Sequence, residues 1–314
     1  MNIEPEEETR RRFGNKISFM EEFKGRTIAV VLDQVQAQMA EGAGAVVLIP
    51  IDGIKQTVVA VEGVQRTTDL STIKKIMSRV LIPVIGRVRV GHVLEAKAME
   101  AAQVACIDES EYLNPIMSAY NHTYTPYFMF REGPDGANGF AYKMEKRTIP
   151  KYPFKIPFIC GAADMSEVLQ QIYEGASMVR TKCADDEETH DASKTFEIVR
   201  KIMGSLDDII NSDETRMYQL AGSYNARPAL LQMIKEQRRL PVPFFAAGSI
   251  YMPIDVAMLM ALGCDGVIVS NRVFNILSPE TRLENIMAAI KKYKEPEELA
   301  KIIKRSGGYG PKPK

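Results

Sequence analysis

Two arginines lie near the end of an apolar run, where a strand could carry functional side chains. The segment VIGRVRVGH (84–92) begins as a buried apolar run and then carries Arg87 and Arg89. Two residues apart, they lie on the same side of a strand. Arginine is the cation least able to do covalent chemistry, because a guanidinium stays charged with a pKa above ~12. At Arg87 the type of residue therefore favours ion pairing or anion binding over nucleophilic catalysis.

Other reactive side chains follow two further apolar runs. The segment IDESE (107–111) supplies Asp108 and Glu111, which are candidate catalytic carboxylates. Lys182 lies in RTKCADDE, and a lysine there can lose its proton when desolvated and attack a carbonyl carbon. The bland alternative is that the acidic residues cap the next element and hold Arg89 in a rim ion network.

Composition excludes several classes of function. Lys plus Arg and Asp plus Glu both number 40, so the formal net charge is zero and indicates neither a nucleic-acid nor a membrane-surface partner. No apolar run approaches the ~18 residues that would cross a bilayer. The N-terminal MNIEPEEETRRRFGNK has no apolar core and is not a secretory signal. We expect a cytoplasmic protein.

The cysteines and histidines form no ligand cluster. The four cysteines are scattered without a CxxC pair, and the three histidines, His92, His122 and His190, lie far apart. We expect buried, reduced thiols, no metal site and no cofactor.

Eight short apolar runs alternate with amphipathic helical patterns. Several runs are continuous, as in parallel strands buried on both faces. They are residues 27–32, 45–50, 82–88, 104–108, 156–161, 177–182, 242–248 and 265–270. The pattern predicts an α/β fold, a (β/α)₈ TIM barrel. A doubly wound open sheet is the alternative, but it would favour a glycine-rich turn after the first strand, and VVLDQVQ has none.

In such a barrel the functional side chains lie at the carboxyl ends of the strands. The residues to consider there are Val30, Asp52, Arg87, Asp108, Gly161, Lys182, Gly248 and Ser270.

The chain divides into three parts. Residues 1–25 form an N-terminal extension and helix, 26–299 the barrel, and 300–314 a flexible C-terminal tail. Residues 112–156 interrupt the barrel as an inserted loop, long and rich in aromatic residues. A loop of this length is typically a lid or an interaction element, and its tyrosines and phenylalanines argue against plain disorder.

At IDESE together with RVGH the chain resembles the PdxS/SNZ family, the synthase subunit of glutamine-dependent pyridoxal 5'-phosphate synthase. Further matching stretches are AEGAGAV, PFICGAAD, EGASMVRTK, LPVPFFAAGSI and PIDVAMLMALGCDGVIVSNRVF. The resemblance implies a (β/α)₈ barrel assembled as hexamers and dodecamers, and a PdxT/SNO-type glutaminase partner near the N-terminal helix. It also implies synthesis of pyridoxal 5'-phosphate from ribose 5-phosphate, glyceraldehyde 3-phosphate and ammonia, through imines on two lysines.

The family's catalytic residues carry over unevenly. Its first Schiff-base lysine is Arg87 here, which cannot form an imine. Its acid-base aspartate aligns with Val30, which cannot move a proton. The second lysine is kept as Lys182, but the glycine-rich phosphate loop after it reads CADDEETHDA, whose carboxylates repel phosphate.

The phosphate-contacting turns are also altered. The family's AAGG ends here as Gly248-Ser249, and its VGSG turn reads VSNR. The resemblance makes the candidate phosphate-binding residues Arg66, Arg180, Gly248, Ser249, Ser270 and Asn271.

Three hypotheses follow. In the first, the chain is a divergent, non-catalytic barrel that assembles with itself or with active paralogous subunits, as a scaffold or regulator. In the second, it is an active synthase that forms its imines on Lys182 alone. In the third, it is a structural protein of another assembly that docks through residues 112–156, whose aromatic residues are of the kind that anchor interfaces.

Overall fold

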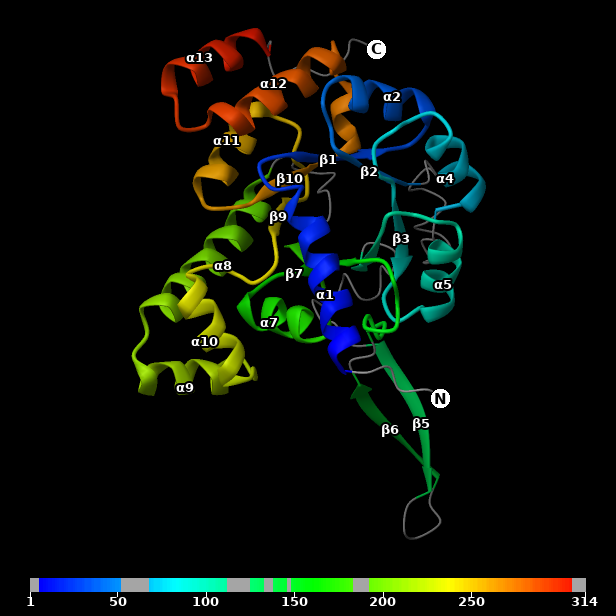
Figure 1. Cartoon of the computed structure of the whole chain (residues 1–314), viewed down its shortest axis with the longest axis vertical. Coiled ribbons are helices and arrows are strands. Elements are labelled where there is room, and N and C mark those ends of the chain that lie inside the picture. Colours follow the sequence, from blue (N-terminus) through cyan, green and yellow to red (C-terminus); the bar gives the residue numbers. More distant parts are fainter. Residues whose placement is uncertain are drawn as a thin grey trace.

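In a computed structural model the chain folds as a barrel of parallel strands (Figure 1). The backbone is described for residues 6–51, 68–111, 125–132, 138–145, 148–182 and 192–306, and the side chains for 14–51, 68–111, 148–182 and 192–306. The barrel strands are β1 (Thr27–Val31), β2 (Val47–Pro50), β3 (Ile85–Arg89), β4 (Cys106–Ser110), β7 (Phe158–Ala162), β8 (Met178–Thr181), β9 (Phe244–Ala247) and β10 (Gly266–Val269).

The strands pair in the order β2-β1-β10-β9-β8-β7-β4-β3, and a parallel bridge between Leu48 and Val84 joins the two ends of this sheet. Each of the eight predicted runs overlaps one strand, so the predicted (β/α)₈ barrel is confirmed. The surrounding helices are α2 (Gln34–Gly42), α4 (Leu70–Met77), α5 (Val93–Ala101), α7 (Met165–Tyr173), α8 (Ser193–Asn211), α9 (Glu214–Ser223), α10 (Pro228–Gln237), α11 (Pro253–Ala261), the 3₁₀ helix η2 (Asn271–Asn275), α12 (Pro279–Lys292) and α13 (Pro296–Arg305).

Local sequence explains where the helices start. Asp33, Asp69, Asp164 and Asp213 each accept a hydrogen bond from a backbone N–H in the first turn of the following helix, as N-cap residues do. Proline occupies the first turn of α10, α11, α12 and α13, where its missing N–H costs nothing. Helix α13 continues to Arg305, within the segment expected to be a tail.

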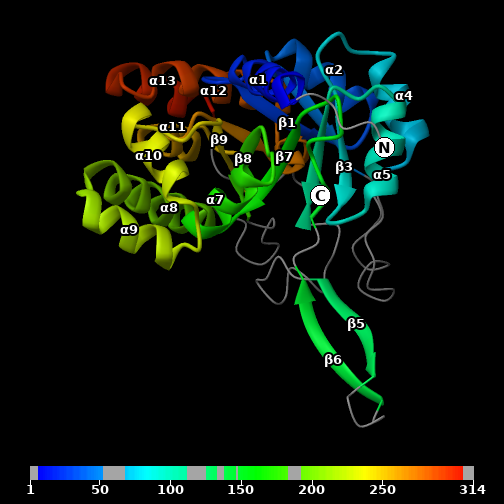
Figure 2. The same ribbon diagram turned by 60° about the horizontal axis from the view of Figure 1, so that its bottom comes forward.

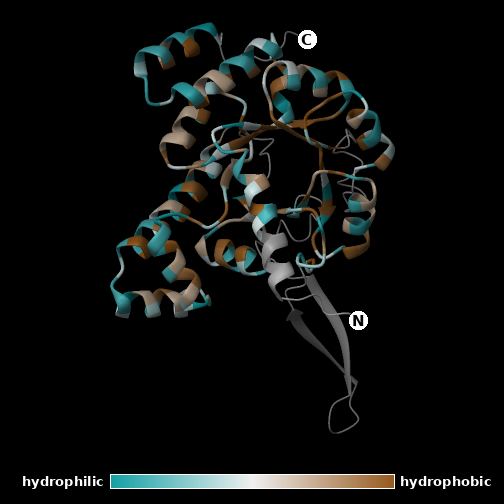
Figure 3. Cartoon of the chain, viewed as in Figure 1, coloured by the Kyte–Doolittle hydropathy of each residue, from teal (hydrophilic) through white to brown (hydrophobic). Residues whose placement is uncertain are grey.

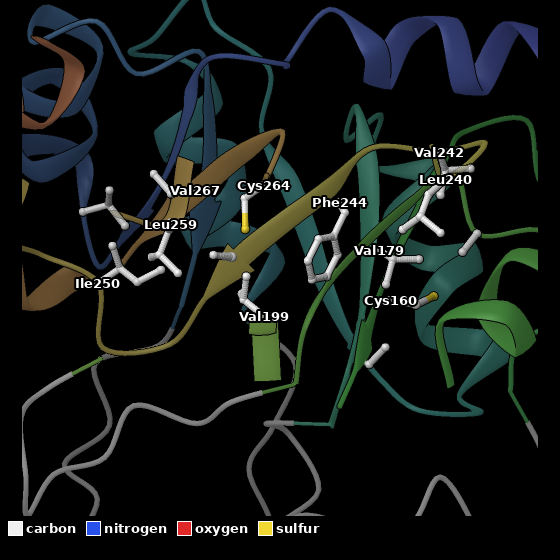
Figure 4. Packing of buried hydrophobic residues seen from close by; sticks show 14 of the residues in the cluster. Cys160, Val179, Val199, Leu240, Val242, Phe244, Ile250, Leu259, Cys264 and Val267 are labelled. Carbon is white, nitrogen blue, oxygen red and sulfur yellow. The ribbon is translucent and has the colours of Figure 1, made fainter. Parts of the chain in front are cut away.

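Apolar side chains fill both faces of the sheet. The outer layer packs between strands and helices, as Figure 4 shows for Val179, Phe244 and Val267 against Val199 and Leu259. The inner cluster fills the barrel, with side chains from alternating strand positions such as Ile28, Ile85 and Ile159. Figure 3 shows the strand ribbons as mainly hydrophobic and the outer helices as mixed.

Helix α1 (Glu6–Glu21) covers one end of the barrel. Met20 and, just after the helix, Phe23 join the inner cluster. Glu21 accepts a hydrogen bond from Arg239 at 2.7 Å, and Lys24 pairs with Asp265 at 3.5 Å. The amino ends of the strands are therefore closed, and the carboxyl ends lie on the opposite side.

The segment 112–156 is not simply a loop. It contains β5 (Thr125–Glu132) and β6 (Asn138–Glu145), which pair as an antiparallel ribbon. Residues 148–156 lie against the barrel, with Ile149 and Phe154 buried.

Candidate functional site

Strand alternation places one ring of side chains inside the barrel near its carboxyl end. Arg87, Asp108, Gly161 and Arg180 each lie two residues after a member of the inner apolar cluster, so they face the same interior. The strand order is β3-β4-β7-β8, with Arg87 opposite Asp108 and Gly161 opposite Arg180. The ring therefore reads arginine, aspartate, glycine, arginine along four neighbouring strands.

Asp108 is the centre of this ring and has no exposed surface. Its Oδ2 accepts a hydrogen bond from Arg87 Nε at 2.8 Å, and its Oδ1 accepts from Arg180 Nε at 3.1 Å and Arg180 Nη2 at 3.0 Å. Burial alone would raise the pKa of Asp108, but the charges of Arg180 and Arg87 outweigh burial and lower it. The carboxyl group is therefore held as a carboxylate between two guanidinium groups.

Arg180 is also fully buried and bridges two carboxylates. Its Nη1 and Nη2 donate to Glu111 Oε1 and Oε2 at 2.8 and 3.0 Å, and Nη2 lies 3.3 Å from Ser110 Oγ. This is the bidentate geometry that suits an arginine and a carboxylate. Two cations and two anions thus balance within the strand ends.

Gly161 makes room for this bridge. A Cβ atom at residue 161 would lie 2.6 Å from both carboxylate oxygens of Glu111, closer than atoms can approach. The glycine on β7 therefore leaves the space through which β8 reaches β4. This explains why a glycine occupies a strand position whose neighbours are charged.

The expectation that Arg89 pairs with the acidic residues of IDESE (107–111) is wrong. Arg89 Nε donates to Glu95 Oε1 of α5 at 2.7 Å, and the Arg89 backbone N–H donates to Glu95 Oε2 at 3.0 Å. Arg89 is the last residue of β3, and the turn through Gly91, whose φ is 78°, brings α5 within its reach. The partner of Asp108 from this strand is instead Arg87.

Glu109 points away from the ring and was not singled out by the sequence. It accepts hydrogen bonds from the backbone N–H groups of Gly91 at 3.0 Å and Ile149 at 2.8 Å, and it pairs with Lys151 at 2.9 Å. Burial alone would lower the pKa of Lys151, but Cys160 and Glu109 raise it above its ordinary value. Glu109 therefore ties residues 148–151 to the turn that follows β3 at Gly91.

Lys182 lies just after β8 with a side chain 8% exposed, and its Nζ is 3.4 Å from Glu167 Oε1. Glu167 also accepts the Ala163 N–H at 2.9 Å, while Asp164 caps the Glu167 N–H. The lysine is thus held by Glu167 in the first turn of α7 and not by the Asp108 ring.

Val30 is buried in the inner apolar cluster. Its environment is that of a packing residue.

Of the phosphate candidates, Arg180 is held by Asp108 and Glu111, while four others lie in turns and caps of the backbone. Ser249 has a left-handed φ of 49°, which a glycine would adopt at no steric cost. The Ser270 N–H donates to Ile250 O at 2.8 Å, and Ser270 Oγ caps η2 by accepting the Arg272 N–H at 3.4 Å. Asn271 is the first residue of η2, and Gly248 O accepts from Thr195 Oγ1 at 2.9 Å. Arg66 and the acidic segment 183–191 lie outside the described residues.

Within the described residues no group of three or more His, Cys, Asp or Glu side chains could hold a metal ion. Across those residues, none of the helices combines the length and hydropathy needed to cross a bilayer. Cys106, Cys160 and Cys264 are buried free thiols, and burial raises the pKa of each.

Comparison with known proteins covers most of the chain. A family model described as the SOR/SNZ family matches residues 12–129 and 139–247. The pyridoxal 5'-phosphate synthase subunit PdxS of Clostridium botulinum is 34% identical over 285 residues, which is 91% of this chain and 88% of the relative. The proteins of the same name from Treponema denticola and Methanopyrus kandleri are 32% and 34% identical, over 93% of this chain and 93% and 89% of their own lengths.

Proposed function

The chain belongs to the SOR/SNZ family, and from this premise we propose that it is a pyridoxal 5'-phosphate synthase-like subunit without synthase activity of its own. It acts as a scaffold or regulator within an assembly of such barrels. The name of its relatives, pyridoxal 5'-phosphate synthase subunit, supports a role of this assembly in vitamin B6 biosynthesis.

The observation that carries the proposal is the ion pair of Arg87 with Asp108. The family resemblance puts the first imine-forming lysine at residue 87. Imine formation needs a neutral amine that can attack a carbonyl, and a guanidinium stays protonated. Arg87 also donates directly to the buried Asp108 at 2.8 Å, so its side chain is committed to an internal contact. Residue 87 therefore keeps a positive charge but has no nucleophilic amine.

Val30 supports the same interpretation. The resemblance puts an acid-base aspartate at residue 30, facing the barrel interior. Valine there packs in the inner apolar cluster and has no proton to transfer. The chain therefore lacks two functional groups that the synthase reaction would use, an amine at residue 87 and a carboxylate at residue 30. The barrel strands that would carry these groups are present.

The other charged side chains at the carboxyl end of the barrel have a structural role. Arg180, Asp108 and Glu111 satisfy one another within the barrel, and removing one partner would leave a buried charge uncompensated. A barrel that keeps this network keeps its shape, and with its shape the surfaces through which subunits assemble.

Co-purification tests the assembly half of the proposal. The tagged chain is co-expressed with an active PdxS relative, and the mass of the recovered complex is measured by native mass spectrometry. We expect mixed oligomers that contain both chains. Recovery of two separate homo-oligomers would contradict a role inside the synthase assembly. The same experiment with the glutaminase subunit shows whether it still docks.

A second candidate function rests on Lys182. This lysine is retained at the end of β8, and its side chain is almost buried beside Glu167. An active synthase would form its imines on Lys182 alone. Borohydride reduction in the presence of ribose 5-phosphate, followed by peptide mapping, tests this candidate, with Lys182→Arg as the matched control. An adduct at Lys182 that the control lacks would favour the synthase, and its absence ends this alternative.

A further inference from the structure

One buried cluster of reactive side chains lies outside the ring around Asp108. It consists of Lys151, Glu109 of β4 and Cys160 of β7, and all three are buried. Glu109 and Cys160 stand opposite each other on neighbouring strands. Cys160 belongs to the outer apolar layer and lies beside Val179 of β8 (Figure 4). The cluster is therefore on the outer side of the sheet, away from the barrel interior.

Glu109 brings the other two side chains together. Its Oε2 lies 2.9 Å from Lys151 Nζ and 3.9 Å from Cys160 Sγ, so the ammonium group and the thiol contact the same oxygen atom. Its Oε1 accepts the backbone N–H groups of Gly91 and Ile149 at 3.0 and 2.8 Å, which fixes the carboxylate. Lys151 Nζ also donates to Ile149 O at 3.3 Å. The nitrogen is therefore held in place on the side of Glu109 that the sulfur also contacts.

The electrostatics of the cluster agree with this contact. Burial alone would lower the pKa of Lys151, but Cys160 and then Glu109 raise it. Cys160 thus affects Lys151 at least as strongly as a carboxylate whose oxygen is 2.9 Å from Nζ. Because such effects weaken with distance, the sulfur and the nitrogen are close neighbours.

We propose that Cys160 and Lys151 form a sulfur–nitrogen crosslink when a peroxide oxidises the thiol. In the first step Cys160 Sγ–H becomes Sγ–OH, and the peroxide is reduced to water. In the second step Glu109 Oε2 accepts a proton from the Lys151 ammonium group, and the neutral amine attacks Sγ. The Sγ–Nζ bond forms and the Sγ–O bond breaks. The hydroxyl group leaves as water with a second proton from the nitrogen.

The cluster suits this reaction in two ways. The amine lies beside the sulfur before oxidation, so it traps Sγ–OH within the same molecule instead of by collision. The product also leaves no unpaired charge, because Lys151 becomes neutral while Glu109 keeps the proton. Two molecules of a thiol reductant reverse the crosslink and are themselves oxidised to a disulfide.

Burial sets the rate and the kind of oxidant. It raises the pKa of the Cys160 thiol well above its ordinary value, so little thiolate is present and oxidation is slow. Hydrogen peroxide is small and uncharged and reaches the sulfur through local opening of the fold. The crosslink would then fasten residues 148–156, which lead from the β5–β6 ribbon into β7, to the strand they precede.

Peptide mapping of the wild-type chain tests the proposal without any substitution. The reduced protein is transferred to buffer without reductant, treated with hydrogen peroxide and digested with trypsin, which cleaves between residues 151 and 160 at Lys155. We expect the peptides that carry Lys151 and Cys160 to be recovered joined, and about 2 Da lighter than their sum, because sulfur and nitrogen each lose one hydrogen. Dithiothreitol should separate them. Oxygen added to Cys160 without a joined peptide, or no reaction, would overturn the proposal.

Two variants identify the atoms that react. Lys151→Arg keeps a positive charge beside Glu109 but offers no nucleophilic amine, so the yield of the joined peptide should fall about tenfold or more. Cys106→Ser is the matched control, because it removes the buried thiol of β4, whose Sγ is 3.6 Å from Ile107 O, and leaves the cluster intact. Its yield should stay within about twofold of the wild type.

An undiminished yield in Lys151→Arg, or a joined peptide that links Cys160 to another cysteine, would contradict the crosslink. The inference goes beyond the proposed function. None of these results depends on pyridoxal 5'-phosphate formation or on assembly with other subunits, so the two can fail separately.

Discussion

Arg87 Nε lies 2.8 Å from Asp108 Oδ2, and these two residues stand directly opposite each other on neighbouring parallel strands. Both are buried at the carboxyl end of the barrel. The position that the family resemblance gives to a nucleophile is therefore occupied by one half of an internal ion pair. The ion pair explains why residue 87 is still positively charged. Because a guanidinium cannot form an imine, we expect the synthase reaction to be lost.

Removing the Arg87 guanidinium should destabilise the barrel more than removing that of its partly exposed neighbour Arg89. Arg87→Met leaves Asp108 with Arg180 as its single cation, so the free energy of unfolding should fall by about 2 kcal/mol or more. Arg89→Met, whose partner Glu95 is partly exposed, is the matched control and should cost clearly less. Urea denaturation followed by circular dichroism measures both. Equal losses would show that the Arg87 pair is not special.

The stability of the fold should depend on acid through Asp108. The pKa of Asp108 is lowered from its ordinary value of 3.8 in the folded state. Its contribution is therefore complete above about pH 4 and is lost as the pH falls through the lower, folded-state pKa. Asp108→Asn lacks this titration. The stability gap between wild type and variant should narrow as the pH falls below about 4, and a constant gap would contradict the assigned charges.

Gly161 should tolerate no side chain. Gly161→Ala places a Cβ 2.6 Å from both Glu111 oxygens, so Glu111 must leave Arg180 or the strand must move. We expect a loss of about 2–4 kcal/mol in the free energy of unfolding. Gly204→Ala is the matched control, because nothing lies within 4 Å of that Cβ and α8 gains a better helix former. It should stabilise by about 0.5–1 kcal/mol. Similar effects of the two substitutions would count against the close packing at Gly161.

The buried pair of Glu109 and Lys151 should behave as a coupled unit. Lys151→Met strands the Glu109 carboxylate in the interior and should cost about 3–5 kcal/mol. Adding Glu109→Gln should recover part of this loss, so the double variant is less damaged than the sum of the single variants. The exposed Lys301 and Glu298 pair on α13 should show no measurable coupling. Additive losses at Glu109 and Lys151 would mean that the two side chains act independently.

The sequence predicted the barrel because its strands are short, apolar and separated by well-capped helices. The chemistry of arginine favoured ion pairing or anion binding at residue 87, and the structure pairs Arg87 with Asp108. The central place of Arg180 was not predicted. It depends on the absence of a side chain at Gly161, and only the strand order shows that β7, which carries Gly161, lies between β4 and β8. The same is true of Lys151, which reaches Glu109 from a segment more than one element away.

The two misjudged features have local causes. Arg89 was expected to join the acidic rim, but the turn at Gly91 presents Glu95 first. The ribbon within residues 112–156 was not anticipated, since TPYFMFRE is apolar at consecutive positions and hides the period of two. The roles of Lys182, Val30 and the phosphate candidates stay predictions, because they concern reactants that bind to the barrel.

Formation of pyridoxal 5'-phosphate by the purified chain tests the central claim most directly. The chain is incubated with ribose 5-phosphate, glyceraldehyde 3-phosphate and an ammonium salt, beside an active PdxS relative at the same concentration. The product is followed by its absorbance. With Arg87 at the imine position and Val30 at the acid-base position, the account predicts no product above the protein-free control. Product formed at a rate like that of the active relative would contradict it.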